Sequence, residues 1–248
     1  MDKKIYLFAN WKMYLNVEES VKLAKDYAKL KYPAKSVEVA VFPSSIAIES
    51  VKKILQKSKM FVGPQNTFWA DKGGYTGEVS STTYKEIGCT HALVGHAERR
   101  HIFKESNHDV RMKLDALLQL SLTPVLCVGE TAEDRKKNET AEVLEAQIRA
   151  AFMDISWPEN ITPIIAYEPV WAVGTGESCE PGEAEKASEM ISNWTEKLIN
   201  KKPVILYGGS VRGENIGRYL ERAHISGVLV GGASAKIETW SELVAQLK

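Results

Sequence analysis

Ala166-Tyr-Glu-Pro-Val-Trp-Ala-Val-Gly-Thr-Gly176 places a carboxylate where an apolar segment ends. The residues Ile164-Ile-Ala166 are typical of a buried strand. Pro169 ends strand pairing because proline has no N–H and a fixed φ, and the two glycines at the far end admit conformations that other residues avoid. We interpret the segment as a strand followed by a covering loop, with Glu168 as a base beneath it. The alternative is a capped strand with Trp171 on the surface.

The same change from a short apolar run to an amphipathic one recurs along the chain. Eight such units over 248 residues give 31 residues per unit, typical of an α/β chain folded as a single-domain (β/α)8 barrel spanning residues 1–248. A doubly wound sheet is the alternative. Most apolar runs lack polar alternation, as expected of parallel strands covered on both faces. The predicted strands are 5–9, 37–42, 60–63, 91–95, 123–128, 161–167, 204–207 and 227–230. The predicted helices are 16–30, 45–56, 80–87, 107–120, 133–152, 183–199, 215–220 and 238–247.

Composition argues against several classes of protein. Lysine plus arginine and aspartate plus glutamate both number 32, so the formal net charge is zero, and neither nucleic acid nor an anionic membrane is favoured as a partner. Three widely spaced cysteines argue against a disulfide framework or a cysteine-rich zinc site and indicate a reducing compartment. No apolar run approaches the roughly 20 residues of a membrane span, and the first residues lack the apolar core of a signal peptide. We therefore expect a cytoplasmic protein.

The residues that follow each strand are the candidates for a site, because chemistry in this barrel lies at the carboxyl ends of the strands. The first strand ends in Asn10-Trp-Lys12, the fourth in Gly95-His96 and the sixth in Glu168. The seventh and eighth end in Gly208-Gly-Ser210 and Gly231-Gly232. A cation, an imidazole, a carboxylate and two glycine-rich turns are therefore expected on one rim.

Taken in order across nearly the whole chain, these segments resemble the triosephosphate isomerase family. A single glycine pair would be weak evidence, whereas the complete series is specific. The matching stretches are Asn10-Trp-Lys-Met13, Gly63-Pro-Gln-Asn66, Tyr75-Thr-Gly-Glu78, Val94-Gly-His-Ala-Glu-Arg-Arg100, Leu126-Cys-Val-Gly-Glu130, Ala166–Gly176, Tyr207-Gly-Gly-Ser-Val211 and Leu229-Val-Gly-Gly-Ala-Ser234.

The resemblance implies an aldose–ketose isomerase of glycolysis and gluconeogenesis. It would interconvert dihydroxyacetone phosphate and D-glyceraldehyde 3-phosphate through a cis-enediolate, without cofactor or metal. Glu168 would be the base, and its pKa must rise toward the working pH, which burial beneath a closed loop can supply. His96 would be a neutral electrophile at the start of a short helix. Lys12 and Asn10, expected on one strand face, would stabilise the oxyanion.

A phosphate group needs no basic cluster, because backbone N–H groups at turns bind anions. The resemblance implies that Ser210, Gly231 and Gly232 bind the phosphate, joined by Gly174 when a lid closes. Closure would exclude water and protect the enediolate from losing its phosphate. The lid residues implied are Pro169, Val170, Trp171, Ala172, Val173, Thr175 and Gly176.

Supporting residues are implied as well. Glu98 would hold Lys12, and Cys127 would lie behind the reacting groups. Tyr207 and Ser210 would hydrogen-bond the closed lid near Gly176 and Cys179.

The segment 66–78 predicts a homodimer with twofold symmetry. On a monomer its apolar base would expose Phe68 and Trp69. By resemblance it inserts into a neighbouring subunit, where Thr76 would support Asn10 and His96.

Three positions depart from the family pattern. Ala97 stands where a serine is usual, and loss of that hydroxyl removes about 1 kcal/mol from the resting position of the base. Glu177-Ser-Cys179 replaces the usual end of the lid, and Tyr14 replaces an asparagine by the subunit contact.

Two other functions stay open from the sequence. A metal-dependent sugar-phosphate epimerase would need paired His and Asp ligands, which the predicted rim lacks. A barrel without catalysis, acting as a binding protein, would have no need to keep Asn10, Lys12, His96 and Glu168 together.

Overall fold

A computed structural model describes residues 3–172 and 178–247 of the chain. Eight parallel strands form one sheet in the order β3-β2-β1-β8-β7-β6-β5-β4. The first strand pairs with both the second and the eighth, so strands from the two ends of the sequence are neighbours. The strands are β1 (Ile5–Asn10), β2 (Val37–Phe42), β3 (Phe61–Val62), β4 (His91–Val94), β5 (Thr123–Val128), β6 (Ile164–Tyr167), β7 (Val204–Tyr207) and β8 (Gly227–Val230).

Two backbone hydrogen bonds join the ends of this sheet. The N–H of Thr90 donates to the carbonyl of Val62 at 3.2 Å, and the N–H of Leu93 donates to the carbonyl of Pro64 at 3.0 Å. The sheet therefore curls into a barrel, which confirms the (β/α)8 prediction and excludes the doubly wound sheet.

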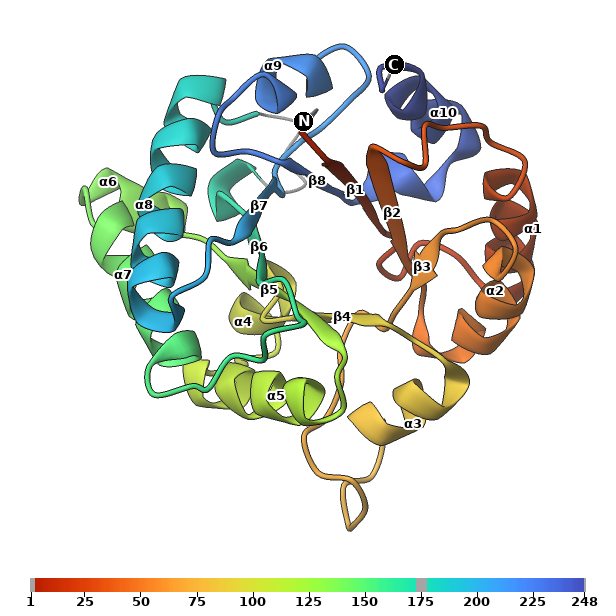
Figure 1. Ribbon diagram of the computed structural model, residues 1–248, viewed down its shortest axis with the longest axis horizontal. Coiled ribbons are helices and arrows are strands. Elements are labelled where there is room, and N and C mark those ends of the chain that lie inside the picture. Colours follow the sequence, from red (N-terminus) through yellow and green to blue (C-terminus); the bar gives the residue numbers. More distant parts are fainter. Residues whose placement is uncertain (1–2, 173–177, 248) are drawn as a thin grey trace.

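Helices surround the strands on the outside, as Figure 1 shows in a view down the barrel. None of the helices in the described part of the chain has the length and apolar character needed to span a bilayer. The helices are α1 (Val17–Tyr27), α2 (Ile48–Leu55), α3 (Ser81–Ile87), α4 (Ala97–His101), α5 (Asn107–Gln119), α6 (Ala132–Lys136), α7 (Thr140–Phe152), α8 (Pro181–Ile199), α9 (Ile216–Leu220) and α10 (Ile237–Ala245).

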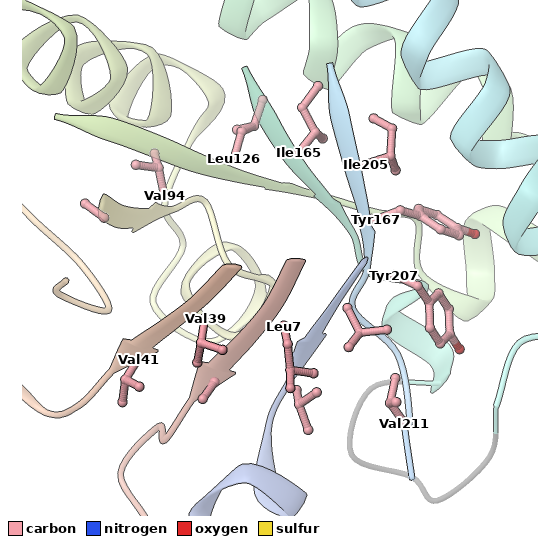
Figure 2. Packing of buried hydrophobic residues seen from close by; sticks show 14 of the residues in the cluster. Leu7, Val39, Val41, Val94, Leu126, Ile165, Tyr167, Ile205, Tyr207 and Val211 are labelled. Atoms are coloured by element: carbon pink, nitrogen blue, oxygen red, sulfur yellow. The ribbon is translucent and has the colours of Figure 1, made fainter. Parts of the chain in front are cut away.

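Side chains alternate between two cores along each strand, because successive residues of a strand point to opposite faces. Leu7 belongs to the outer core, between the strands and the helices, whereas the adjacent Phe8 belongs to the core inside the barrel. Figure 2 shows the outer set, in which Tyr167 and Tyr207 project from the neighbouring strands β6 and β7. The strands are thus buried on both sides, as their apolar sequences predict.

The sequence patterns locate most helix boundaries. The predicted cap at Asn16 is confirmed, since its side chain accepts from the N–H of Glu19 and the Glu19 carboxylate accepts from the N–H of Asn16. The single helix predicted over residues 133–152 is wrong, because the chain forms α6 and α7 instead. Asn138, between them, has a φ of 60°, a left-handed conformation that asparagine tolerates and that ends a helix.

Candidate active site

The carboxyl ends of the strands border a cavity of about 270 Å³. All four residues predicted to be catalytic line it: Asn10, Lys12, His96 and Glu168. The turns that follow β7 and β8 complete the lining. The barrel therefore brings together groups separated by more than half of the sequence.

Glu168 is fixed by three hydrogen bonds at the end of β6. Its own N–H donates to the carbonyl of Val128 at 2.8 Å. Its Oε2 accepts from the N–H of Ala97 at 2.9 Å, and its Oε1 lies 3.0 Å from Nε2 of His96. A Cβ on Gly208 would lie 2.8 Å from Cγ of Glu168, so the glycine leaves room for the carboxylate side chain. Glu168 is only 2% exposed.

The expected rise of the Glu168 pKa is not found in this arrangement. Burial acts to raise the pKa of Glu168, but the hydrogen bond from His96, the N–H of Ala97 and the charge of Lys12 together hold it below its ordinary value. A carboxylate that accepts hydrogen bonds and faces cations favours its charged form. The side chain is therefore ionised in this resting position.

His96 is placed by the short helix α4, of which it is the N-cap residue. Its Nδ1 accepts from the N–H of Glu98 at 3.2 Å, which assigns the ring hydrogen of a neutral imidazole to Nε2. That nitrogen faces Glu168. His96 is thus oriented as a neutral donor toward the cavity.

The sequence led us to expect Lys12 on the same strand face as Asn10. In the structure Lys12 instead lies beyond the end of the first strand. Strand β1 ends at Asn10, and Lys12 has a φ of 47°. Its N–H donates to Oδ1 of Asn10 at 3.0 Å, and its carbonyl accepts from Nε2 of Gln65 at 2.7 Å. The ammonium lies 2.8 Å from Oε1 of Glu98. Gln65 was assigned no function from the sequence, although it belongs to the quoted segment Gly63–Asn66.

The glycine-rich turn that follows β8 lies close to the side chain of Lys12. Ser210, Gly231 and Gly232 line the cavity. A Cβ on Gly231 would lie 3.1 Å from Cε of Lys12, so a larger residue would crowd the lysine. Gly174, the fourth predicted phosphate ligand, lies outside the described residues.

The beginning of the predicted lid is anchored by Glu130. The N–H of Val170 donates to the Glu130 carbonyl at 3.0 Å, and Nε1 of Trp171 donates to Oε1 of its carboxylate at 2.8 Å. The guanidinium of Arg135 lies 4.0 Å from the Trp171 ring centre and pairs with Glu183 on α8 at 2.9 Å.

Pro169 and Ala172 lie in the same described segment, and the N–H of Ala172 donates to the carbonyl of Pro169 at 2.7 Å. The lid residues Val173, Thr175 and Gly176 lie outside the described residues, as does Glu177. The anchoring function of Glu130 was missed, although its position two residues beyond β5 could have suggested it.

Two further predicted residues lie behind the cavity. The hydroxyl of Tyr207 accepts from the N–H of Cys179 at 3.0 Å. Cys127 is fully buried, and burial, followed by the charge of Glu168, raises its pKa well above the ordinary range. Arg100, also missed from the sequence, donates to the carbonyls of Gly95 and Cys127 at 2.7 and 3.3 Å and thereby ties the ends of β4 and β5 together.

Thr76 lies in the loop that connects β3 and α3, which projects beyond the ring of helices in Figure 1. Its side chain is exposed and does not line the cavity of its own chain. The prediction that Phe68 and Trp69 would be exposed is wrong, because both are half-buried and their rings stack with centres 4.0 Å apart. The exposed large apolar side chains include Tyr75 in this loop and, elsewhere, Met13, Tyr14, Ile46, Ile102 and Phe103.

No cluster of three or more His, Cys, Asp or Glu side chains with metal-binding geometry occurs among residues 3–172 and 178–247.

Comparison with known proteins gives a consistent result. A family model described as triosephosphate isomerase matches residues 5–247. Over 246 residues the chain is 38% identical to the triosephosphate isomerase of Geotalea uraniireducens, with 98% of each chain covered. It is also 38% identical to that of Caldanaerobacter subterraneus, covering 95% of this chain and 96% of the relative. Identity to the enzyme of Fusobacterium nucleatum is 36%, with 98% of each chain covered.

Proposed function

Because the chain belongs to the triosephosphate isomerase family, we propose that it interconverts dihydroxyacetone phosphate and D-glyceraldehyde 3-phosphate through a cis-enediolate. It would act as a single-domain cytoplasmic enzyme of glycolysis and gluconeogenesis, without cofactor or metal. The observation that carries this proposal is the cavity that joins Glu168, His96 and Lys12 to the turns after β7 and β8.

Glu168 takes a proton from the carbon beside the carbonyl group and returns it one carbon along. To reach the substrate, its carboxylate leaves the N–H of Ala97, which lies 2.9 Å from Oε2 in the resting position. The contacts that lower its pKa are then weakened while burial remains. The pKa therefore rises on the way to the substrate, which makes the carboxylate a stronger base.

The negative charge that develops on the substrate oxygens is stabilised by three groups. His96 donates from Nε2 and exchanges protons with the two oxygens. Lys12 supplies a fixed positive charge, and its position is set by Glu98 at 2.8 Å. Asn10 supplies its side-chain amide N–H groups, while its Oδ1 accepts from the N–H of Lys12. Donors preorganised around a developing oxyanion are commonly the largest single contribution to catalysis.

The phosphate binds at the turns that carry Ser210, Gly231 and Gly232, with Gly174 as a further ligand. The segment 169–176 serves as the lid, and Tyr207 hydrogen-bonds the chain just beyond it. Support comes from the position of the two turns in the cavity beside Lys12. Lid closure excludes water and prevents the enediolate from expelling its phosphate.

A coupled assay with glyceraldehyde 3-phosphate, run with and without EDTA, tests the proposal. We expect isomerase activity that EDTA leaves unchanged. Activity abolished by EDTA would contradict the cofactor-free mechanism and favour a metal-dependent epimerase. Absence of turnover with both triose phosphates would favour a barrel that only binds them.

We also propose a homodimer with twofold symmetry, in which the projecting loop 66–78 inserts into the neighbouring subunit and Thr76 supports Asn10 and His96 there. The exposed apolar side chains favour it, since Met13 is 93% and Ile46 78% exposed in the single chain. Sedimentation at the assay concentration tests it. A fully active monomer would contradict the proposal.

A further inference from the structure

Two tyrosines hydrogen-bond the backbone of Cys179, which lies between the lid and helix α8. The N–H of Cys179 donates to the hydroxyl of Tyr207 at 3.0 Å. On the other side of the same residue, its carbonyl accepts from the hydroxyl of Tyr219 at 2.6 Å. The rings of the two tyrosines stack with centres 4.0 Å apart and planes 12° from parallel. Tyr219 is on α9 and was given no function by the sequence.

The two hydrogen bonds fix different parts of the backbone. The bond to Tyr207 orients the peptide group before Cys179, and the bond to Tyr219 orients the peptide group after it. Fixing both neighbouring peptide planes restricts φ and ψ of one residue. Because a catalytic loop moves through residues whose torsion angles change, a residue with fixed torsion angles next to the loop acts as an anchor for its end.

The surroundings of Cys179 leave it little other freedom. Its side chain is fully buried, and α8 starts two residues later at Pro181 and continues for 19 residues. Tyr219 is itself buried, and burial raises the pKa of its phenol, so the hydroxyl keeps its hydrogen at neutral pH. Cys179 is thus a fixed anchor at the start of a rigid helix.

We propose that Tyr219 is a positioning residue for the isomerisation. By holding the carbonyl of Cys179 it aims the N–H of Cys179 at Tyr207, and so sets how well the lid retains the enediolate. The inference rests on the proposed function. It also predicts that Tyr219 and Tyr207 act through the backbone of the same residue, Cys179, so that their effects on kcat/KM are not independent.

The experiment measures two quantities in the full-length enzyme with glyceraldehyde 3-phosphate as substrate. The first is kcat/KM for isomerisation. The second is inorganic phosphate released per turnover, which reports enediolate lost when the C–O bond to phosphate breaks and its electron pair leaves with the phosphate. Replacing a residue that only stabilises the fold would lower stability without changing the phosphate released per turnover. The variants are Tyr207→Phe, Tyr219→Phe and the double variant, all of which keep the stacked rings.

Tyr219→Phe should lower kcat/KM by roughly threefold to tenfold and raise phosphate release per turnover by a similar factor, the scale of one lost hydrogen bond. The double variant should lie within about twofold of Tyr207→Phe, whereas independent effects would multiply. Amide hydrogen exchange at Cys179 should be faster in Tyr219→Phe. The matched control is Tyr32→Phe, which also removes a hydroxyl that donates to a backbone carbonyl, that of Ser58 at 3.0 Å, far from the lid. Its phosphate release should equal that of the wild type.

An active Tyr219→Phe enzyme with wild-type phosphate release, or a double variant whose losses multiply, would overturn this inference alone. A wild-type protein without isomerase activity would overturn the proposed function and the inference with it.

Discussion

Replacing Trp171 by phenylalanine should destabilise the protein, because it removes the hydrogen bond from the indole to the buried carboxylate of Glu130. Glu130 is 1% exposed, and its Oε1 accepts from Nε1 of Trp171 at 2.8 Å and from the hydroxyl of Tyr167 at 3.1 Å. Its Oε2 is buried and has no partner among the described residues. Among the residues that the structure describes, Trp171→Phe leaves Tyr167 as the only side-chain donor to the Glu130 carboxylate.

A hydrogen bond to a charged buried group contributes about 1.5–3 kcal/mol. In a protein of this size 1 kcal/mol corresponds to roughly 2–4 °C in Tm, so Trp171→Phe should lower Tm by roughly 3–12 °C. The loss should depend on pH. Burial already raises the pKa of Glu130 above its ordinary 4.5, and losing the Trp171 donor raises it further. The charged carboxylate therefore lowers the unfolding free energy more in the variant. The difference between the two proteins grows as pH rises from the wild-type pKa of Glu130, which lies above 4.5, to the higher pKa of the variant.

Urea unfolding at pH 5 and pH 8 measures both effects. The matched control is Trp157→Phe, which removes an indole that donates to a neutral acceptor, the carbonyl of Ile161 at 2.7 Å. It should cost about 1 kcal/mol with no added pH dependence. Placing Glu130→Gln in the Trp171→Phe background should remove the pH dependence. If both tryptophan variants lost the same unfolding free energy at pH 5 and pH 8, Trp171 would not stabilise the charge of Glu130.

Three further predictions concern the base. Ala97→Ser should change kcat/KM by less than roughly tenfold, because the N–H at this position already binds Glu168 at 2.9 Å and the hydroxyl would add only a second donor; a hundredfold change in the coupled assay would refute this. Gly208→Ala should lower kcat, since its Cβ would lie 2.8 Å from Cγ of Glu168 and displace the carboxylate; wild-type kcat would contradict the crowding. Because the pKa of Glu168 is held below its ordinary 4.5, the base is ionised above that pH, and activity disappears only as pH falls through the pKa. The pH profile of kcat/KM, corrected for ionisation of the substrate phosphate, should therefore show no enzyme acid limb above about pH 4.5.

The sequence predicts the barrel and the cavity lining because both follow from local signals. Apolar runs of strand length give the eight strands, and their last residues meet at one rim whatever the details of packing. The groups that orient the site could not be found in this way. Gln65, Arg100 and Tyr219 act through hydrogen bonds to the backbone of Lys12, Cys127 and Cys179, all far away in sequence, and no local pattern marks such contacts.

The low pKa of Glu168 in its resting position could not be predicted from the sequence for a related reason. Burial can be predicted from an apolar strand, but the N–H of Ala97 and the ring of His96 approach the carboxylate only in the folded barrel. The left-handed turn at Lys12 is likewise invisible in a strand pattern, since it depends on Asn10 and Gln65 binding the lysine backbone on two sides.

Turnover of the Glu168→Gln enzyme tests whether Glu168 is the base. Glutamine keeps an oxygen that can accept from the N–H of Ala97 but cannot remove a proton. We expect kcat to fall by at least about a thousandfold, within the range of general-base catalysis, while Tm stays within a few degrees of the wild type. A folded Glu168→Gln enzyme with kcat within tenfold of the wild type would contradict it.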